Sequence, residues 1–92
     1  MPPTPARFRL SPLPWVYMLR CGDGSLYTGV AKDVEARLKQ HQDGKGARYT
    51  RAHLPVTLAW SRECATWGEG LKEEFRIKSL NREAKEKLVN GE

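Results

Sequence analysis

Two short runs of apolar and aromatic residues open the patterned part of the chain. The runs WVYMLRC and SLYTGV are rich in β-branched and aromatic residues, and the sequence GDG separates them. Such runs favour strands, and an Asp-Gly pair between two strands favours a tight turn. The pattern therefore predicts a β-hairpin that carries Tyr17 on its first strand and Tyr27 on its second.

The length of the turn decides whether the two tyrosines share a face of the hairpin. A two-residue turn made of Asp23 and Gly24 would point the two rings to opposite faces. A three-residue loop that begins at Gly22, with Gly24 in the left-handed conformation, would shift the register by one residue and place both rings on one face. The sequence fits both registers, and only the second lets the tyrosines contribute to one site.

The stretch DVEARLKQH, residues 33–41, predicts the first helix. Asp33 can cap its N-terminus, and no glycine or proline interrupts it. At about 100° per residue, one side of this helix mixes apolar residues with an arginine and a histidine: Val34, Arg37, Leu38 and His41. Because an unpaired buried charge is costly, these polar groups are expected either to pair inside the protein or to bind something.

The second half of the chain adds one strand and two helices. Residues 43–51, DGKGARYTR, predict a polar loop because of their glycines. Residues 53–61 alternate and predict a half-buried strand, whose apolar side is formed by Leu54, Val56, Leu58 and Trp60. A helix is predicted over residues 66–80, and Asn81 begins a shorter one. The order β-β-α-β-α-α predicts the α+β class, with a small, mostly antiparallel three-stranded sheet flanked by helices.

Two neighbouring glutamates of the helix TWGEGLKEEFRIKSL fall on different sides of it. At about 100° per residue, Glu74 lies within the apolar arc, and Glu73 lies outside the arc, as a solvated charge would. The arc is formed by Trp67, Leu71, Phe75 and Ile77, and Lys78 also falls within it. Glu74 is therefore expected to face the interior of the protein.

The inward-facing groups admit two interpretations. In the structural one, Arg37 and Glu74 form an internal salt bridge and His41 is a core histidine with its hydrogen bonds satisfied. In the functional one, the three side chains belong to a shared site. Likewise, Tyr17 and Tyr27 are either ordinary amphipathic core residues or members of that site.

Composition limits the class of protein. The chain has 92 residues, enough for one small domain, and five of its 6 prolines lie among the first fourteen residues. We expect residues 1–13 to be a mobile tail and residues 14–92 to form a single domain. Because no apolar run approaches the roughly 18 residues of a membrane span and the N-terminus lacks the apolar segment of a secretory signal, we expect no membrane association and a cytoplasmic location.

Charge and cysteine content narrow the choice of partner. The 16 Lys and Arg residues against 11 Asp and Glu residues give a formal net charge of +5, which favours a polyanionic partner such as nucleic acid. Cys21 and Cys64 are far apart and have no second pair at zinc-binding spacing. We therefore expect reduced, half-buried thiols and no zinc site.

The ordered set of these residues resembles the GIY-YIG nuclease family. The sequence WVY, residues 15–17, stands where the family has GIY, and YTG, residues 27–29, stands where it has YIG. Arg37, His41 and Glu74 follow at matching places. The resemblance extends from residue 15 to about residue 89 and is strongest to small stand-alone bacterial members. Trp15 and Val16 replace the first two residues of GIY, and Thr28 replaces the isoleucine of YIG.

The resemblance implies a divalent-metal-dependent endonuclease that hydrolyses phosphodiester bonds, with DNA as the expected substrate, in branched, flapped or damaged forms. Glu74 would hold a single Mg²⁺ or Mn²⁺, and Arg37 would bind the scissile phosphate. Tyr17 or Tyr27 would orient and deprotonate the attacking water, with His41 as the proton acceptor behind it. Family members also use an asparagine after the glutamate, for which the chain offers Asn81 and Asn90.

A basic segment adds candidate nucleic-acid contacts. Lys45, Arg48 and Arg51 surround Tyr49, so that the segment could grip phosphates and stack one ring on a base. Its simpler interpretation is a solvated basic loop. The alternative to an endonuclease is a nucleic-acid-binding module with the same fold and little or no catalysis, and a partner protein could modify either activity.

Overall fold

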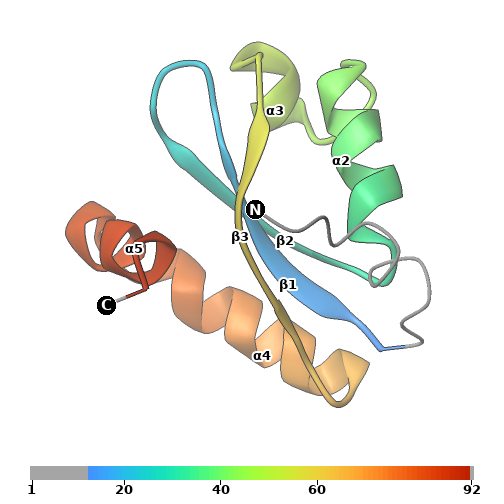
Figure 1. Cartoon of the computed structure of the whole chain (residues 1–92), viewed down its shortest axis with the longest axis vertical. Helices are drawn as coiled ribbons and strands as arrows, with labels where there is room; N and C mark the ends of the chain where they lie inside the picture. The colour runs from blue at the N-terminus through green and yellow to red at the C-terminus, as the bar shows by residue number, and fades with distance from the viewer. Residues whose placement is uncertain (1–12, 92) are drawn as a thin grey trace.

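A three-stranded antiparallel sheet forms the centre of the protein, as Figure 1 shows. The computed structural model describes residues 13–91. Its strands are β1 (Trp15–Arg20), β2 (Leu26–Ala31) and β3 (Thr57–Glu63), in the order β2-β1-β3. Strand β1 is apolar at nearly every position because both of its faces are covered, as is typical of a central strand. The predicted α+β class and antiparallel sheet are confirmed.

The β1–β2 hairpin has the register that allows a shared site. Tyr17 lies opposite Gly29, and Gly29 is two positions from Tyr27 on the same strand. Gly24 has a φ of +87°, and its N–H donates to the carbonyl oxygen of Cys21 at 2.9 Å. The turn is therefore the three-residue loop, and both tyrosine rings lie on one face of the sheet.

Helices cover both faces of this sheet (Figure 1). Helices α2 (Val34–Gln42) and α3 (Arg48–Ala52) lie over the face that carries Tyr17, where Val34 and Leu38 join the core. Helices α4 (Trp67–Lys78) and α5 (Arg82–Val89) lie over the opposite face and pack against the other side of β1. The single sheet thus separates two apolar clusters.

Helix α3 was not predicted, and the observed order is β-β-α-α-β-α-α. The polar segment 43–51 does begin as a loop, because Gly44 has a φ of +76° and follows the end of α2. From Arg48 onward, however, the chain forms a helix of 5 residues. One and a half helical turns are too short for a periodic apolar pattern to develop, so the glycines dominated the sequence signal.

The prediction that one side of β3 carries all its apolar residues is wrong. The register with β1 shifts between Met18, which pairs with Trp60, and Leu19, which pairs with Leu58. Ala59 is the extra residue of this bulge. Leu58 therefore packs on the α2 side of the sheet and Trp60 on the α4 side.

The prediction of the buried side of α4 is also wrong. Trp67, Leu71 and Phe75, three residues of the predicted apolar arc, are 45%, 46% and 77% exposed. Ile77, at the edge of the predicted arc, is the buried member, and it shares the buried side of the helix with Gly70. A Cβ atom on Gly70 would lie only 3.2 Å from Cγ1 of Val30, so glycine allows α4 to approach β2 closely.

The predicted helix starts are confirmed. The carboxylate of Asp33 accepts a hydrogen bond from the N–H of Ala36 at the start of α2, and the Asn81 side chain accepts one from the N–H of Ala84 at the start of α5. A mobile tail was predicted over residues 1–13, and residues 1–12 lie outside the described part of the chain. Within residues 13–91, no helix is both long and apolar enough to cross a bilayer.

Candidate active site at the edge of the sheet

Both tyrosines and His41 meet on one face of the sheet. The hydroxyl oxygen of Tyr17 lies 3.0 Å from Nε2 of His41, and the rings of Tyr27 and His41 meet edge to face with 5.4 Å between their centroids. A Cβ atom on Gly29 would lie 2.5 Å from the Tyr17 hydroxyl oxygen. The absence of a side chain at Gly29 therefore lets the buried Tyr17 ring extend over edge strand β2.

The hydrogen bonds around His41 assign its tautomer. Its Nδ1 lies 2.7 Å from Oγ1 of Thr50, and the Thr50 hydroxyl donates to the carbonyl oxygen of Ala47 at 2.9 Å. Since that hydroxyl has one hydrogen, it must accept the bond from His41, so Nδ1 carries the proton. Nε2 is then free to accept the bond that the Tyr17 hydroxyl donates. Sequence analysis missed Thr50.

The electrostatics of Tyr17 connect four elements of the structure. Burial raises the pKa of Tyr17 to about 12, and nearby Arg37 acts in the opposite direction by favouring the phenolate. Tyr27 and Glu74 raise the same pKa through their charge. Groups on β2, α2 and α4 thus all influence the charge of the Tyr17 phenol on β1.

His41 is neutral at physiological pH. Burial of the ring, and then the positive charge of Arg37, hold the pKa of His41 below its ordinary value of 6.5. The side chain is completely buried, and both ring nitrogens have partners. The site therefore contains a neutral imidazole that accepts a hydrogen bond from a tyrosine.

Arg37 and Glu74 do not form the internal salt bridge of the structural interpretation. The guanidinium of half-buried Arg37 donates to Oε1 of Gln40 at 2.7 Å. The carboxylate of Glu74, whose side chain is 22% exposed, pairs with Nζ of Lys78 at 3.1 Å. Each charged group is therefore paired with a residue of its own helix, and neither is paired with the other.

Glu73 differs from the sequence prediction of a solvated charge. Its side chain is only 14% exposed, and its carboxylate pairs with Arg76 and with Arg62 on β3, the latter at 3.1 Å. The hydrogen bond from Arg76 lowers the pKa of Glu73. The ion pair of Glu73 with Arg62 links α4 to β3. Glu73 lies on the buried side because the whole helix is rotated relative to the predicted orientation.

Glu74 is the carboxylate that a metal ion at this site would use. Within residues 13–91, no group of three or more His, Cys, Asp and Glu side chains could enclose an ion. A single carboxylate suits Mg²⁺ or Mn²⁺, hard cations that keep most of their water ligands, and does not suit a closed zinc site. The donor set is thus compatible with the metal that the sequence resemblance implies.

The basic segment divides into two parts. Lys45, Arg48 and Arg51 are exposed around α3. Tyr49 instead faces the sheet: its hydroxyl donates to Oγ of Ser25 at 2.6 Å, and its ring lies nearly parallel to that of Tyr27, with 6.1 Å between the centroids. Tyr49 therefore packs beside Tyr27 of the candidate active site, whereas the three cations are exposed to solvent.

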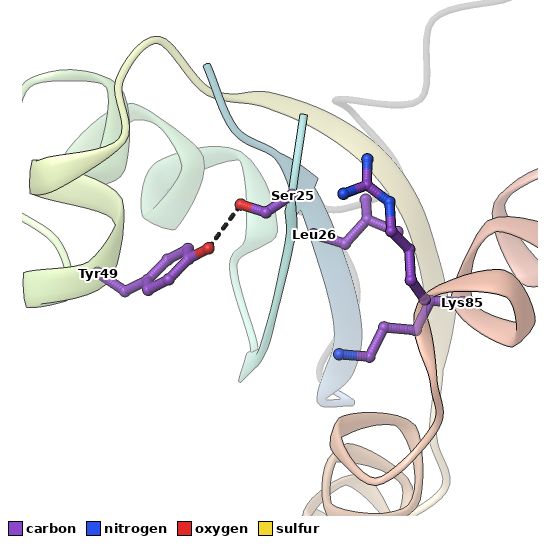
Figure 2. A pocket seen from close by; sticks show the side chains of 5 residues that line it. Ser25, Leu26, Tyr49 and Lys85 are labelled. Carbon is purple, nitrogen blue, oxygen red and sulfur yellow. Dashed lines mark hydrogen bonds between the residues drawn. The ribbon is translucent and has the colours of Figure 1, made fainter. Parts of the chain in front are cut away.

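A groove crosses the edge strand beside these residues, and we call it the β2-edge groove. It consists of two adjoining hollows of about 220 Å³ and about 340 Å³, which share Leu26, Tyr49 and Lys85. Figure 2 shows Tyr49 and Lys85 on opposite sides of β2. Tyr27 lines the larger hollow, so the groove adjoins the candidate active site. The helices also contribute Lys78 and Arg82 to its lining, and sequence analysis missed this basic wall.

Comparison with known protein families identifies a family for most of the chain. The family model described as the GIY-YIG catalytic domain matches residues 13–87. The chain belongs to the GIY-YIG family. The predicted resemblance is confirmed, and the triplets at Tyr17 and Tyr27, together with Arg37 and Glu74, lie within the matched residues.

The similar members of the GIY-YIG family are small bacterial proteins. A UPF0213 protein of Staphylococcus epidermidis is 48% identical over 75 residues, which cover 82% of this chain and 92% of that protein. One from Streptococcus sanguinis is 54% identical over 71 residues, or 77% and 82% of the two chains. The solution structure of a UPF0213 protein from Bacillus halodurans has a TM-score of 0.55 and 43% identity, and covers 84% of this chain and 82% of that one.

Proposed function

We propose that this protein is a divalent-metal-dependent endonuclease that hydrolyses phosphodiester bonds, with DNA in branched, flapped or damaged form as its substrate. The observation that carries the proposal is the hydrogen bond between the Tyr17 phenol and His41, with the Tyr27 ring against the same imidazole and the charges of Arg37 and Glu74 acting on the phenol. Membership of the GIY-YIG family supports the reaction class. The net charge of +5 supports a polyanionic substrate.

Tyr17 and His41 would activate the attacking water. The water gives a proton to the Tyr17 oxygen while Tyr17 passes its own proton to Nε2 of His41, along the existing 3.0 Å hydrogen bond. A bond forms between the water oxygen and phosphorus, and the bond from phosphorus to the leaving 3′ oxygen breaks. Thr50 supports this step because it keeps the other proton of His41 on Nδ1.

Arg37 and Tyr27 would bind and position the scissile phosphate. A guanidinium can donate two parallel hydrogen bonds to phosphate oxygens, which a lysine cannot match, and it stabilises the negative charge of the transition state. Tyr27 is half-buried and lines the groove, so its hydroxyl can reach a bound substrate. Its ring contact with His41 orients it.

Glu74 would hold a single Mg²⁺ or Mn²⁺. A bound cation of this kind supplies positive charge to the leaving oxygen. Lys78 pairs with Glu74 in the present structure and neutralises the carboxylate. An i,i+4 pair on a partly exposed helix surface contributes only about 0.3 to 0.5 kcal/mol, so it yields readily to a divalent ion.

Lys45, Arg48 and Arg51 would contact the phosphate backbone outside the reaction centre, and Tyr49 would contact a base. The cations are exposed on α3 and the turn before it, the same segment that contributes Tyr49 to the groove. Contacts of this kind bind any sequence and weaken with salt.

The test is a cleavage screen over duplex, single-stranded, flapped and branched DNA and RNA, with Mg²⁺, Mn²⁺ or EDTA. We expect cleavage of at least one DNA form in the presence of either metal and none in EDTA. The variant Arg37→Gln, purified in the same way, controls for contaminating nucleases and should be inactive. Binding without cleavage on every substrate would contradict the proposal and favour the nucleic-acid-binding module.

A further inference from the structure

The β2-edge groove has an aromatic wall that is held rigidly in place. The Tyr49 hydroxyl donates to Ser25, whose own hydroxyl donates to the carboxylate of Asp23 at 2.6 Å. The His53 ring stacks on Tyr49 with 4.1 Å between centroids and 20° between planes, and His53 lines neither hollow. Tyr49 nevertheless remains 41% exposed. A fixed, accessible ring loses little conformational entropy when a flat ligand stacks on it.

The opposite wall is basic and only partly neutralised. Lys85 is half-buried and lines both hollows, and no acidic side chain within residues 13–91 pairs with it. Arg82 is anchored by a 3.0 Å hydrogen bond from Nη2 to the carbonyl oxygen of Gly24, with Glu86 3.8 Å from its Nε. A half-buried ammonium group without an acidic partner is well placed to receive an anion such as a phosphate.

The floor of the groove contains a buried hydroxyl that lacks a partner. Thr28 lines the larger hollow and is 2% exposed, and its Oγ1 has no hydrogen-bond partner among the residues described. A buried polar group that forms no hydrogen bond is costly, and such groups are rare in folded proteins. The oxygen itself is covered by its neighbours, so the base and phosphate contacts of a ligand would come from the two walls.

We infer that the β2-edge groove binds one unpaired strand of nucleic acid, with a base on Tyr49 and the phosphates along Lys85 and Arg82. Aromatic and basic walls together are the usual means of binding single strands, because an unpaired base exposes a face that stacking in a duplex conceals. The inference rests on the proposed nuclease function and narrows its substrate. Since Tyr27 lines both the groove and the active site, the cleaved bond would lie in or beside a single-stranded segment, as in a flap or an overhang.

Binding in EDTA tests this inference without requiring cleavage. Fluorescence anisotropy would compare a labelled single-stranded DNA, an RNA of the same sequence and the corresponding DNA duplex, over several salt concentrations. We expect the parent protein to prefer single strands. Tyr49→Leu removes the ring and should weaken single-strand binding about tenfold or more, whereas Tyr49→Phe keeps the ring and should stay within about threefold of the parent.

The basic wall provides an independent comparison on one helix. Lys85→Gln should weaken single-strand binding and lower the slope of log affinity against log salt by about 0.7. Lys87→Gln is the matched control, because Lys87 is exposed on the same helix and lines neither hollow. This pair also serves if Tyr49→Leu does not fold. Comparing ribose and deoxyribose strands decides whether the groove distinguishes DNA from RNA.

The outcomes separate this inference from the nuclease proposal. Binding that prefers single strands and depends on Tyr49 and Lys85 supports the groove, even if no substrate is ever cleaved. Equal binding of duplex and single strand, or equal effects of Lys85→Gln and Lys87→Gln, would overturn the groove even if the protein proves to be an active nuclease. Absence of any nucleic-acid binding would overturn the groove as well.

Discussion

Replacement of Thr50 by valine tests the hydrogen-bond chain that orients His41. The side chain is fully buried, and its hydroxyl makes bonds of 2.7 Å with His41 and 2.9 Å with Ala47. Valine keeps the shape but leaves the imidazole N–H without a partner, whereas the Ala47 carbonyl oxygen keeps its hydrogen bond from the N–H of Arg51 at 3.0 Å. A buried N–H left unsatisfied costs about 1 to 3 kcal/mol, partly offset by the added methyl group, so we expect a net loss of about 1 to 2 kcal/mol.

The control Thr50→Ser separates the hydroxyl from the methyl group. Serine keeps both hydrogen bonds and should cost about 1 kcal/mol for the lost methyl. In a domain of this size, 1 kcal/mol shifts the melting temperature by roughly 4 to 8 °C, so a thermal melt followed by circular dichroism measures both losses, and the histidine spectrum separates the two variants. Nitrogen-15 spectra of the histidine ring should show the Nδ1–H tautomer of His41 in the parent and in Thr50→Ser, and its loss in Thr50→Val.

The cleavage rate should depend on which tautomer His41 adopts. If His41 moves its proton to Nε2, it can no longer accept the Tyr17 proton, and Thr50→Val should be less active even at temperatures where it is fully folded. A valine variant with an unchanged histidine spectrum and the cleavage rate of the serine variant would refute the assignment of the hydrogen-bond chain.

Three further substitutions probe the same site. Gly29→Ala would place a Cβ atom 2.5 Å from the Tyr17 hydroxyl oxygen, so it should displace Tyr17 and reduce both stability and cleavage; a melt and activity equal to the parent's would contradict the packing. The pKa of His41 is lowered in the folded protein, so below about pH 6.5 the unfolded chain binds a proton that the folded protein does not, and the free energy of unfolding should fall as pH decreases from 7. Urea titrations should show a weaker dependence of this free energy on pH in His41→Gln than in the parent. The same pH dependence in both proteins would exclude His41 as its cause. Arg37→Lys keeps the charge but loses the planar donor pair, so cleavage should fall about tenfold or more while the melting temperature changes little; unchanged rates would exclude bidentate phosphate binding.

Local signals in the sequence predicted the parts of the site that depend on one element. Asp33 caps α2, and the helical period places Val34, Leu38 and His41 toward the sheet, as expected. The hairpin register needed one additional fact, the left-handed conformation of Gly24, which decided between two turns that the sequence permits equally. Local rules sufficed because each of these features involves residues close in the chain.

The errors arose where tertiary packing outweighs the apolar pattern. Helix α4 is oriented by close contact at Gly70, a residue with no side chain and hence no hydrophobic signal, and Phe75 is left 77% exposed. The same rotation buries Glu73, so this residue is no longer suitable as an inert control for Glu74. Thr50, on α3, contacts His41, on α2, and no spacing of residues in the sequence indicates this contact.

The most direct test of the proposed nuclease is the metal-dependent cleavage rate of Glu74→Gln on the best substrate from the screen. The variant removes the charge that would hold the cation and should cleave about a hundredfold more slowly or worse in Mg²⁺ or Mn²⁺. Its free energy of unfolding should stay within about 1 kcal/mol of the parent's, because only the partly exposed pair with Lys78 is lost. Glu83→Gln, an exposed glutamate on α5, is the control and should change neither quantity. A Glu74→Gln protein that cleaves at the parent's rate would contradict the account.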